Sequence, residues 1–85
     1  MDDNSTYGTS LFNVDEIQDA LVETTLDEVY SALLYRGYNP VNQIVGYLLT
    51  GDASYITSYN NARDKILSID RGKVIEAVVR SYLEH

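Results

Sequence analysis

The sequence predicts an all-α protein from three observations. Apolar residues recur every three or four positions through most of the chain, which is the spacing of an α-helix. Asn, Asp, Pro and Gly residues stand where helices begin and end. No segment alternates polar and apolar residues over enough positions to make a strand. We therefore expect a small compact bundle of four to five helices, with residues 1–13 as a flexible tail and residues 14–85 as one helical domain.

The N-terminal segment is polar, includes Gly8 and shows no sustained period. Such a composition buries too little apolar surface to offset the entropy of ordering, which favours a flexible tail. Leu11 and Phe12 leave a second interpretation open, in which they pin the end of the tail to the helical body.

The first helix is predicted over residues 14–36. Asn13 is a candidate N-cap, and Asp15 and Glu16 occupy the first turn, where the helix dipole favours acidic side chains. The apolar stripe is an i, i+4 ladder with flanking residues: Ile17, Leu21, Thr25, Val29 and Leu33, beside Ala20, Leu26, Tyr30 and Ala32. This stripe is wider than one neighbouring helix needs, so we expect it to serve both an internal helix and a second chain.

The second helix is predicted over residues 40–50, because both of its ends are marked in the sequence. The marks are a glycine that closes the preceding helix, an N-cap, a first-turn proline and a terminating glycine: Gly37, Asn39, Pro40 and Gly51. Between them only Asn42 and Gln43 are strongly polar, which predicts a buried helix.

A short connection and a third helix should follow. Asp52 is a candidate cap for a turn over residues 53–56, and residues 57–61 have the composition of a loop. The third helix is expected from Asn60 to Ile69, with Ala62, Ile66 and Ile69 facing inward.

The last helix should be capped by Asp70 and end at Leu83. Gly72 in its first turn weakens the start by up to about 1 kcal/mol relative to alanine. The residues expected to face inward are Val74, Ile75, Val78, Val79, Tyr82 and Leu83.

The composition favours an oligomer. A chain of this size buries only about 60–65% of its unfolded surface. It has no cysteine and no plausible zinc-binding set, so disulfides and metal are not expected to add stability. An apolar fraction of 45% and eight tyrosines are high for a small monomer. We therefore expect an intertwined homodimer.

The formal charge of −7 is concentrated at one end, since residues 1–28 contain eight acidic residues and no basic one. Affinity for nucleic acids and anionic lipids comes largely from Lys and Arg, so both kinds of partner are disfavoured. The N-terminus lacks the basic and apolar regions of a signal peptide, and no apolar run approaches the ~20 residues of a membrane span. We expect a cytoplasmic protein.

Enzyme activity is not expected. The only histidine is the terminal His85, and there is no glycine-rich phosphate loop, HExxH motif or nucleophile elbow. The like-charge i, i+4 pairs Asp15/Asp19 and Asp19/Glu23 are typical of a solvated helix face. We therefore expect no cofactor and no metal. Five tyrosines are interpreted as packing or dimer residues: Tyr35, Tyr38, Tyr47, Tyr55 and Tyr59.

One continuous string carries a family resemblance: Gly37-Tyr-Asn-Pro-Val-Asn-Gln-Ile-Val-Gly-Tyr-Leu-Leu-Thr-Gly-Asp52, continued by Ala53-Ser54-Tyr55-Ile56. Further positions match beyond it: Ala62-Arg63, Ile66, Arg71, Ile75-Glu76, Val79 and Tyr82-Leu83. The chain resembles the IreB/ReoM family of small regulatory phosphoproteins from Gram-positive bacteria over about residues 26–83.

The resemblance implies a small helical homodimer without enzymatic activity. It also implies a substrate of a membrane Ser/Thr kinase with extracellular PASTA repeats, and of the partner phosphatase. In the family, the unphosphorylated form restrains cell-wall synthesis. In the best understood branch it promotes Clp-protease degradation of UDP-N-acetylglucosamine 1-carboxyvinyltransferase, which starts peptidoglycan precursor synthesis. The expected partners are a second copy, the kinase and phosphatase, and the Clp machinery or this enzyme.

The family's phosphoacceptor is a tail threonine three positions before an aromatic residue. The resemblance places it at Thr9, with Phe12 as the aromatic residue, and Thr6 matches a lesser acceptor of one branch. Ser5 and Ser10 have no such match. The alternative is that Thr9 is a solvated tail residue without a role.

The resemblance further suggests a partner-binding basic surface at Arg63 and Arg71. Family arginines are absent at three positions, so partner affinity or identity is expected to differ: Ser58, Leu67 and Ser68. We expect the Thr9 phosphate to dock on Arg63 and Arg71 or on helix N–H groups. The alternatives are repulsion of the phosphate by the acidic first helix, and salt bridges from both arginines to that helix in either protomer.

Two other functions remain open from the sequence. One is a non-phosphorylated dimeric scaffold or adaptor, and the other is a nucleic-acid-binding module.

Overall fold

The computed structural model describes residues 14–84, and this part of the chain consists of helices and turns without a strand. The elements are α1 (Val14–Tyr35), α2 (Pro40–Thr50), the 3-10 turns η2 (Ala53–Tyr55) and η3 (Tyr59–Asn61), α3 (Ala62–Leu67) and α4 (Arg71–Leu83). The all-α prediction is confirmed. The predicted tail, its candidate cap Asn13, and His85 lie outside the described residues.

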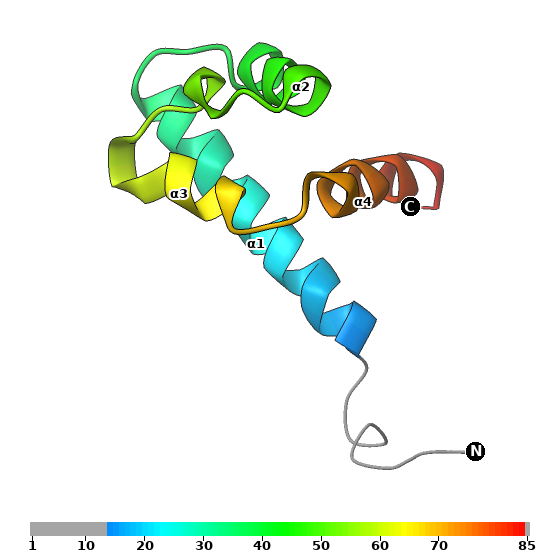
Figure 1. Cartoon of the computed structure of the whole chain (residues 1–85). Helices are drawn as coiled ribbons and strands as arrows, with labels where there is room; N and C mark the ends of the chain where they lie inside the picture. The colour runs from blue at the N-terminus through cyan, green and yellow to red at the C-terminus, as the bar shows by residue number, and fades with distance from the viewer. Residues whose placement is uncertain (1–13, 85) are drawn as a thin grey trace, which may run out of the picture.

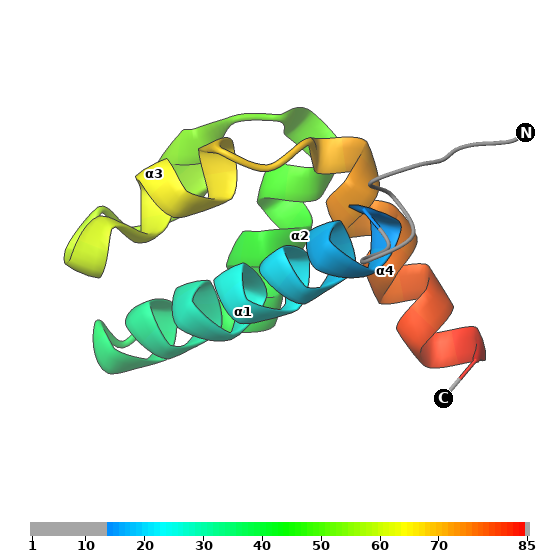
Figure 2. The same cartoon turned by 90° about the horizontal axis from the view of Figure 1, so that it is seen from below.

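α1 is the central element, because α2, α3 and α4 all contact it. α2 and α3 pack towards its C-terminal end, and α4 projects away from these three helices (Figures 1 and 2). The core lies between α1, α2, α3 and the α2–α3 connection, and its buried residues are Val29, Ala32, Leu33, Tyr47, Ile56, Ala62 and Ile66. No helix over residues 14–84 has the length and apolarity that crossing a bilayer requires.

Only part of the α1 ladder is buried in this chain. Val29 and Leu33 are fully buried, whereas Ile17 and Leu21 are 45% and 57% exposed. α2 and α3 cover the C-terminal end of the ladder, so its N-terminal end is left open. Val22, which is not in the predicted ladder, is buried instead.

The predicted ends of α2 are confirmed. The Asn39 side chain accepts a hydrogen bond from the Asn42 backbone amide at 3.1 Å. Gly37 and Gly51 both have the left-handed φ that a helix-terminating glycine supplies, at +87° and +75°. The prediction that α2 is buried is wrong for the single chain, because only Pro40 and Tyr47 are buried.

α3 is shorter than predicted. The expected helix from Asn60 to Ile69 is a six-residue helix from Ala62 to Leu67, preceded by η3 within the predicted loop. Asn60 and Asn61 have φ values of 58° and 61°. A right-handed helix cannot continue through two left-handed residues, which asparagine tolerates better than most residue types. Ala62 and Ile66 are buried as predicted, and Ile69 is partly buried.

α4 begins and ends where the sequence predicted, and Asp70 accepts a hydrogen bond from the Lys73 backbone amide at 3.1 Å. The predicted inward face is wrong for the single chain, because Val74 is the only buried residue of this helix. The other five are 41–78% exposed: Ile75, Val78, Val79, Tyr82 and Leu83. The reason is that α4 meets α1 along one face and projects beyond it (Figure 2).

Three side chains hold the connection between α2 and α3. The predicted cap Asp52 accepts from the Ser54 backbone amide at 2.9 Å. Gln43 Nε2 donates to the Tyr55 carbonyl at 2.9 Å, and Arg63 Nε donates to the Ile56 carbonyl at 2.8 Å. These bonds fix the connection while Ile56 is inserted into the core.

The two terminating glycines provide a matched test of this geometry. Replacing Gly37 or Gly51 with alanine should destabilise the protein by about 1–2 kcal/mol, because both residues have left-handed φ. A Cβ at position 51 would also collide with the Arg71 guanidinium, whereas nothing lies within 4 Å of a Cβ at position 37. We expect Gly51→Ala to cost at least as much as Gly37→Ala in urea unfolding. Unchanged stability in Gly51→Ala would contradict the geometry.

Candidate interaction surface

The most unusual feature of the surface is the amount of apolar side chain that it exposes on α4. Ile75, Val79 and Leu83 recur at i, i+4 and i+8, and are 41%, 49% and 68% exposed. We call these three residues the α4 outer stripe. A different row of α4, which includes Val74 and Val78, faces α1. α4 is therefore apolar over much of its circumference, but α1 covers only one side of it.

α2 repeats this arrangement. Its inner face supplies Pro40 and Tyr47 to the interior. Val41, Val45 and Leu49 form a second row at i, i+4 and i+8, and are 63%, 46% and 80% exposed. We call these the α2 outer stripe. Contiguous exposed apolar surface of this kind is typical of a protein–protein interface.

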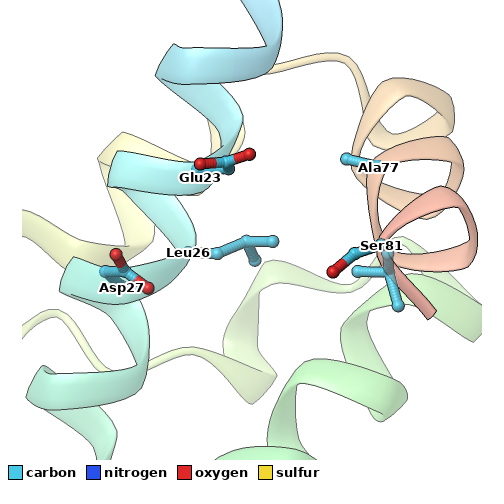
Figure 3. A pocket seen from close by; sticks show the side chains of 6 residues that line it. Glu23, Leu26, Asp27, Ala77 and Ser81 are labelled. Atoms are coloured by element: carbon cyan, nitrogen blue, oxygen red, sulfur yellow. The ribbon is translucent and has the colours of Figure 1, made fainter. Parts of the chain in front are cut away.

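A cavity of about 430 Å³ lies between α1 and α4. On one side it is lined by Glu23, Leu26 and Asp27 of α1, and on the other by Ala77, Val78 and Ser81 of α4. Figure 3 shows the two sets of side chains facing each other across it. Leu26 and Val78 make its wall partly apolar, so the α1–α4 contact is incompletely packed in the single chain.

The two predicted partner-binding arginines each contact the segment that connects α2 to α3. Arg63 donates from Nε to the Ile56 carbonyl, and the Arg71 guanidinium lies against Gly51. Asp52 lies between these two contact points in the sequence. Hydrogen bonds from the Ser54 backbone amide and hydroxyl lower the pKa of Asp52, and the positive charge of Arg63 acts in the same direction. The structure thus brings both arginines to one segment, although their role in partner binding remains a prediction.

Other basic residues form the ion pairs to α1. Lys65 Nζ lies 3.5 Å from Glu28 Oε1, and an Arg80 guanidinium nitrogen lies 3.4 Å from Asp19 Oδ2. Among the described side chains of residues 17–84 in one chain, neither Arg63 nor Arg71 forms an ion pair with α1. Salt bridges from these arginines to α1 of a second copy stay a prediction. Exposed pairs such as these contribute about 0–1 kcal/mol each.

Two of the tyrosines that the sequence indicated as packing or dimer residues form a stack at the C-terminal end of α1, which the sequence did not predict. The Tyr35 and Tyr59 rings stack with centroids 4.9 Å apart, and the Arg36 guanidinium lies 5.7 Å from the Tyr59 centroid. Position 59 is far from 35 in the sequence, so only the fold shows this contact. Tyr47 is buried as expected for a packing residue, and the Tyr55 ring covers Gly46.

These observations describe a surface suited to binding other proteins. The described residues hold no group of three or more His, Cys, Asp or Glu side chains placed to bind a metal ion. The predicted phosphoacceptors Thr9 and Thr6 lie outside the described residues. Their assignment therefore remains a prediction.

Comparison with protein families gives a match over nearly the whole chain. The model of the IreB regulatory phosphoprotein family matches residues 7–84. The match contains all four helices and extends into the segment before α1. The chain therefore belongs to the IreB family of regulatory phosphoproteins.

Proposed function

We propose that the protein is a cytoplasmic phosphorylation switch that controls peptidoglycan synthesis. It is phosphorylated by a PASTA-type Ser/Thr kinase, mainly at Thr9, and dephosphorylated by the partner phosphatase. The observation that carries the proposal is the family match, which spans residues 7–84 and includes Thr9 together with the helical body. Thr6 lies just before the matched residues and is proposed as the lesser acceptor.

We propose that phosphorylation acts by changing the binding of the protein to another protein. The unphosphorylated protein promotes Clp-dependent turnover of UDP-N-acetylglucosamine 1-carboxyvinyltransferase, through a surface that includes Arg63 and Arg71. Support comes from the position of both arginines at the same connection, and from the lack of an ion pair for either among the described side chains of residues 17–84. A phosphate adds about −1.5 to −2 charges and three strong acceptor oxygens, so it competes with an acidic partner for these guanidinium groups.

We propose that the acting form is a homodimer paired through α4. A helix with apolar residues on two sides needs two neighbours, and over the described residues of one chain the main neighbour of α4 is α1. The α2 outer stripe is the proposed second contact, since it is another row of three exposed apolar residues at helical spacing.

Thr9→Ala tests the phosphorylation site. We expect that incubating the wild-type protein with a PASTA-type kinase and ATP adds a phosphate, located by mass spectrometry at Thr9. Thr9→Ala should lose most of this modification, because no other hydroxyl occupies the family position. Ser10→Ala is the matched control and should be phosphorylated like the wild type. Equal phosphorylation of Thr9→Ala and wild type would refute the assignment.

The same variants test whether phosphorylation changes partner binding. In a pull-down with the carboxyvinyltransferase and the Clp components, Thr9→Ala should retain partners as the unphosphorylated protein does. Thr9→Asp and the phosphorylated protein should retain less. Identical retention by all forms would favour a scaffold that phosphorylation does not control.

A further inference from the structure

The N-terminal half of α1 carries an apolar stripe that stays exposed in the described structure. Ile17 and Leu21 lie one turn apart on the same face and are 45% and 57% exposed. Leu21 also lines a cavity of about 240 Å³ between α1 and the α3–α4 turn, together with Val22 and Ile69. The polar residues of the same lining are Gln18, Ser68, Asp70 and Lys73. Leu21 belongs both to the stripe and to the cavity lining, so the two features adjoin.

We propose that Phe12 of the same chain occupies this site and packs against Ile17 and Leu21. The described helix begins at Val14, and Gln18 lies about 6 Å further along its axis. Two residues of extended chain span about 7 Å. A chain that folds back just before α1 therefore brings the Phe12 ring to the stripe.

The sequence around the start of α1 supports this fold-back. With Asn13 as the N-cap, Phe12 stands at the N′ position and Ile17 at N4. These are the two positions whose apolar side chains pack together in a hydrophobic staple. Glu16 stands at N3, where a glutamate side chain bonds back to the backbone amide of the cap residue. The exposed stripe, the adjacent cavity and the position of Phe12 relative to the start of α1 all point to the Phe12 ring as the occupant.

Docking of Phe12 has a consequence for the phosphoacceptor. Thr9 lies three residues before Phe12, so the anchor fixes where the threonine emerges while leaving its hydroxyl outside the cavity. The kinase then meets Thr9 beside the α1–α4 end of the body. This consequence rests on the proposed function, whereas the docking itself does not.

Paramagnetic broadening in the full chain tests the docking. The protein has no cysteine, so Ser10→Cys provides a single attachment point for a nitroxide in ¹⁵N-labelled protein. We expect the amide signals of residues 68–73 to lose intensity, although they are distant from position 10 in sequence. Adding Phe12→Ala should restore those signals. Adding Tyr7→Ala, which removes another aromatic residue of the same segment, should leave them broadened.

A substitution in the cavity lining provides a second test of the docking. Leu21→Gln should restore the signals of residues 68–73 without altering the N-terminal segment. Leu67→Gln, at a residue of similar exposure on α3, is the matched control and should leave the broadening unchanged. Full intensity of residues 68–73 in the starting labelled protein, or broadening that survives Phe12→Ala, would overturn the proposal.

A mixed sample separates docking within a chain from docking between chains. Nitroxide-labelled ¹⁴N protein is mixed with unlabelled ¹⁵N protein, and the signals of residues 68–73 should keep their intensity. Broadening in this mixture would assign the site to a second copy and overturn the proposal. None of these readouts involves the kinase, so a failure of docking is distinguishable from a failure of the phosphorylation proposal.

Discussion

Leu33→Ala should destabilise the protein by about 2–5 kcal/mol, the range for removing a large buried aliphatic side chain and leaving a cavity. Leu33 is fully buried, and it belongs to the cluster in which α1, α2, α3 and the α2–α3 connection meet. Small domains have only about 5–15 kcal/mol of stability in total. A loss of this size should therefore be visible as a large decrease in the urea midpoint.

Leu67→Ala is the matched control for this effect. Leu67 is 52% exposed on α3, so truncating the same side chain there removes few contacts. We expect a change within about 0.5 kcal/mol, as for most surface substitutions. Equal destabilisation by the two variants would show that the core is not centred on Leu33.

If the protein pairs through α4 as proposed, Val79→Asp should convert the dimer into monomers while leaving the helical body folded. Val79 is the middle residue of the α4 outer stripe and is 49% exposed in the single chain. Pairing through α4 would bury the new carboxylate without a partner, which costs several kcal/mol. Because each 1.4 kcal/mol or so is a factor of ten in affinity, the dimer should weaken roughly a hundredfold or more. Analytical ultracentrifugation over a concentration series measures this shift.

The control must separate loss of pairing from loss of folding. Leu67→Asp introduces the same charge at an exposed apolar residue outside both outer stripes, and its sedimentation should match the wild type. Circular dichroism of Val79→Asp should retain the wild-type helix content. A wild-type protein that sediments as a 9.6 kDa monomer at all concentrations would contradict the dimer proposal.

The sequence determined the helices and most of their ends, because these depend on local chemistry. Asn39, Asp52 and Asp70 each accept a hydrogen bond from a nearby backbone amide, as their positions predicted. Gly37 and Gly51 adopt the left-handed conformation that ends a helix. α3 was predicted too long because Asn60 and Asn61 are compatible with a helix in composition, while their backbone is left-handed.

Only the tertiary structure decided which apolar residues are covered. Helical spacing identifies an apolar face but not what packs on it, since burial depends on where distant elements come to lie. α4 projects from α1, so Val74 is buried while Val79, on the same predicted face, is half exposed. The fold likewise brought Tyr35 onto Tyr59, and Arg63 and Arg71 onto one connection. The Tyr35–Tyr59 and Arg71–Gly51 contacts join residues at least 20 positions apart, and local sequence patterns do not specify such contacts.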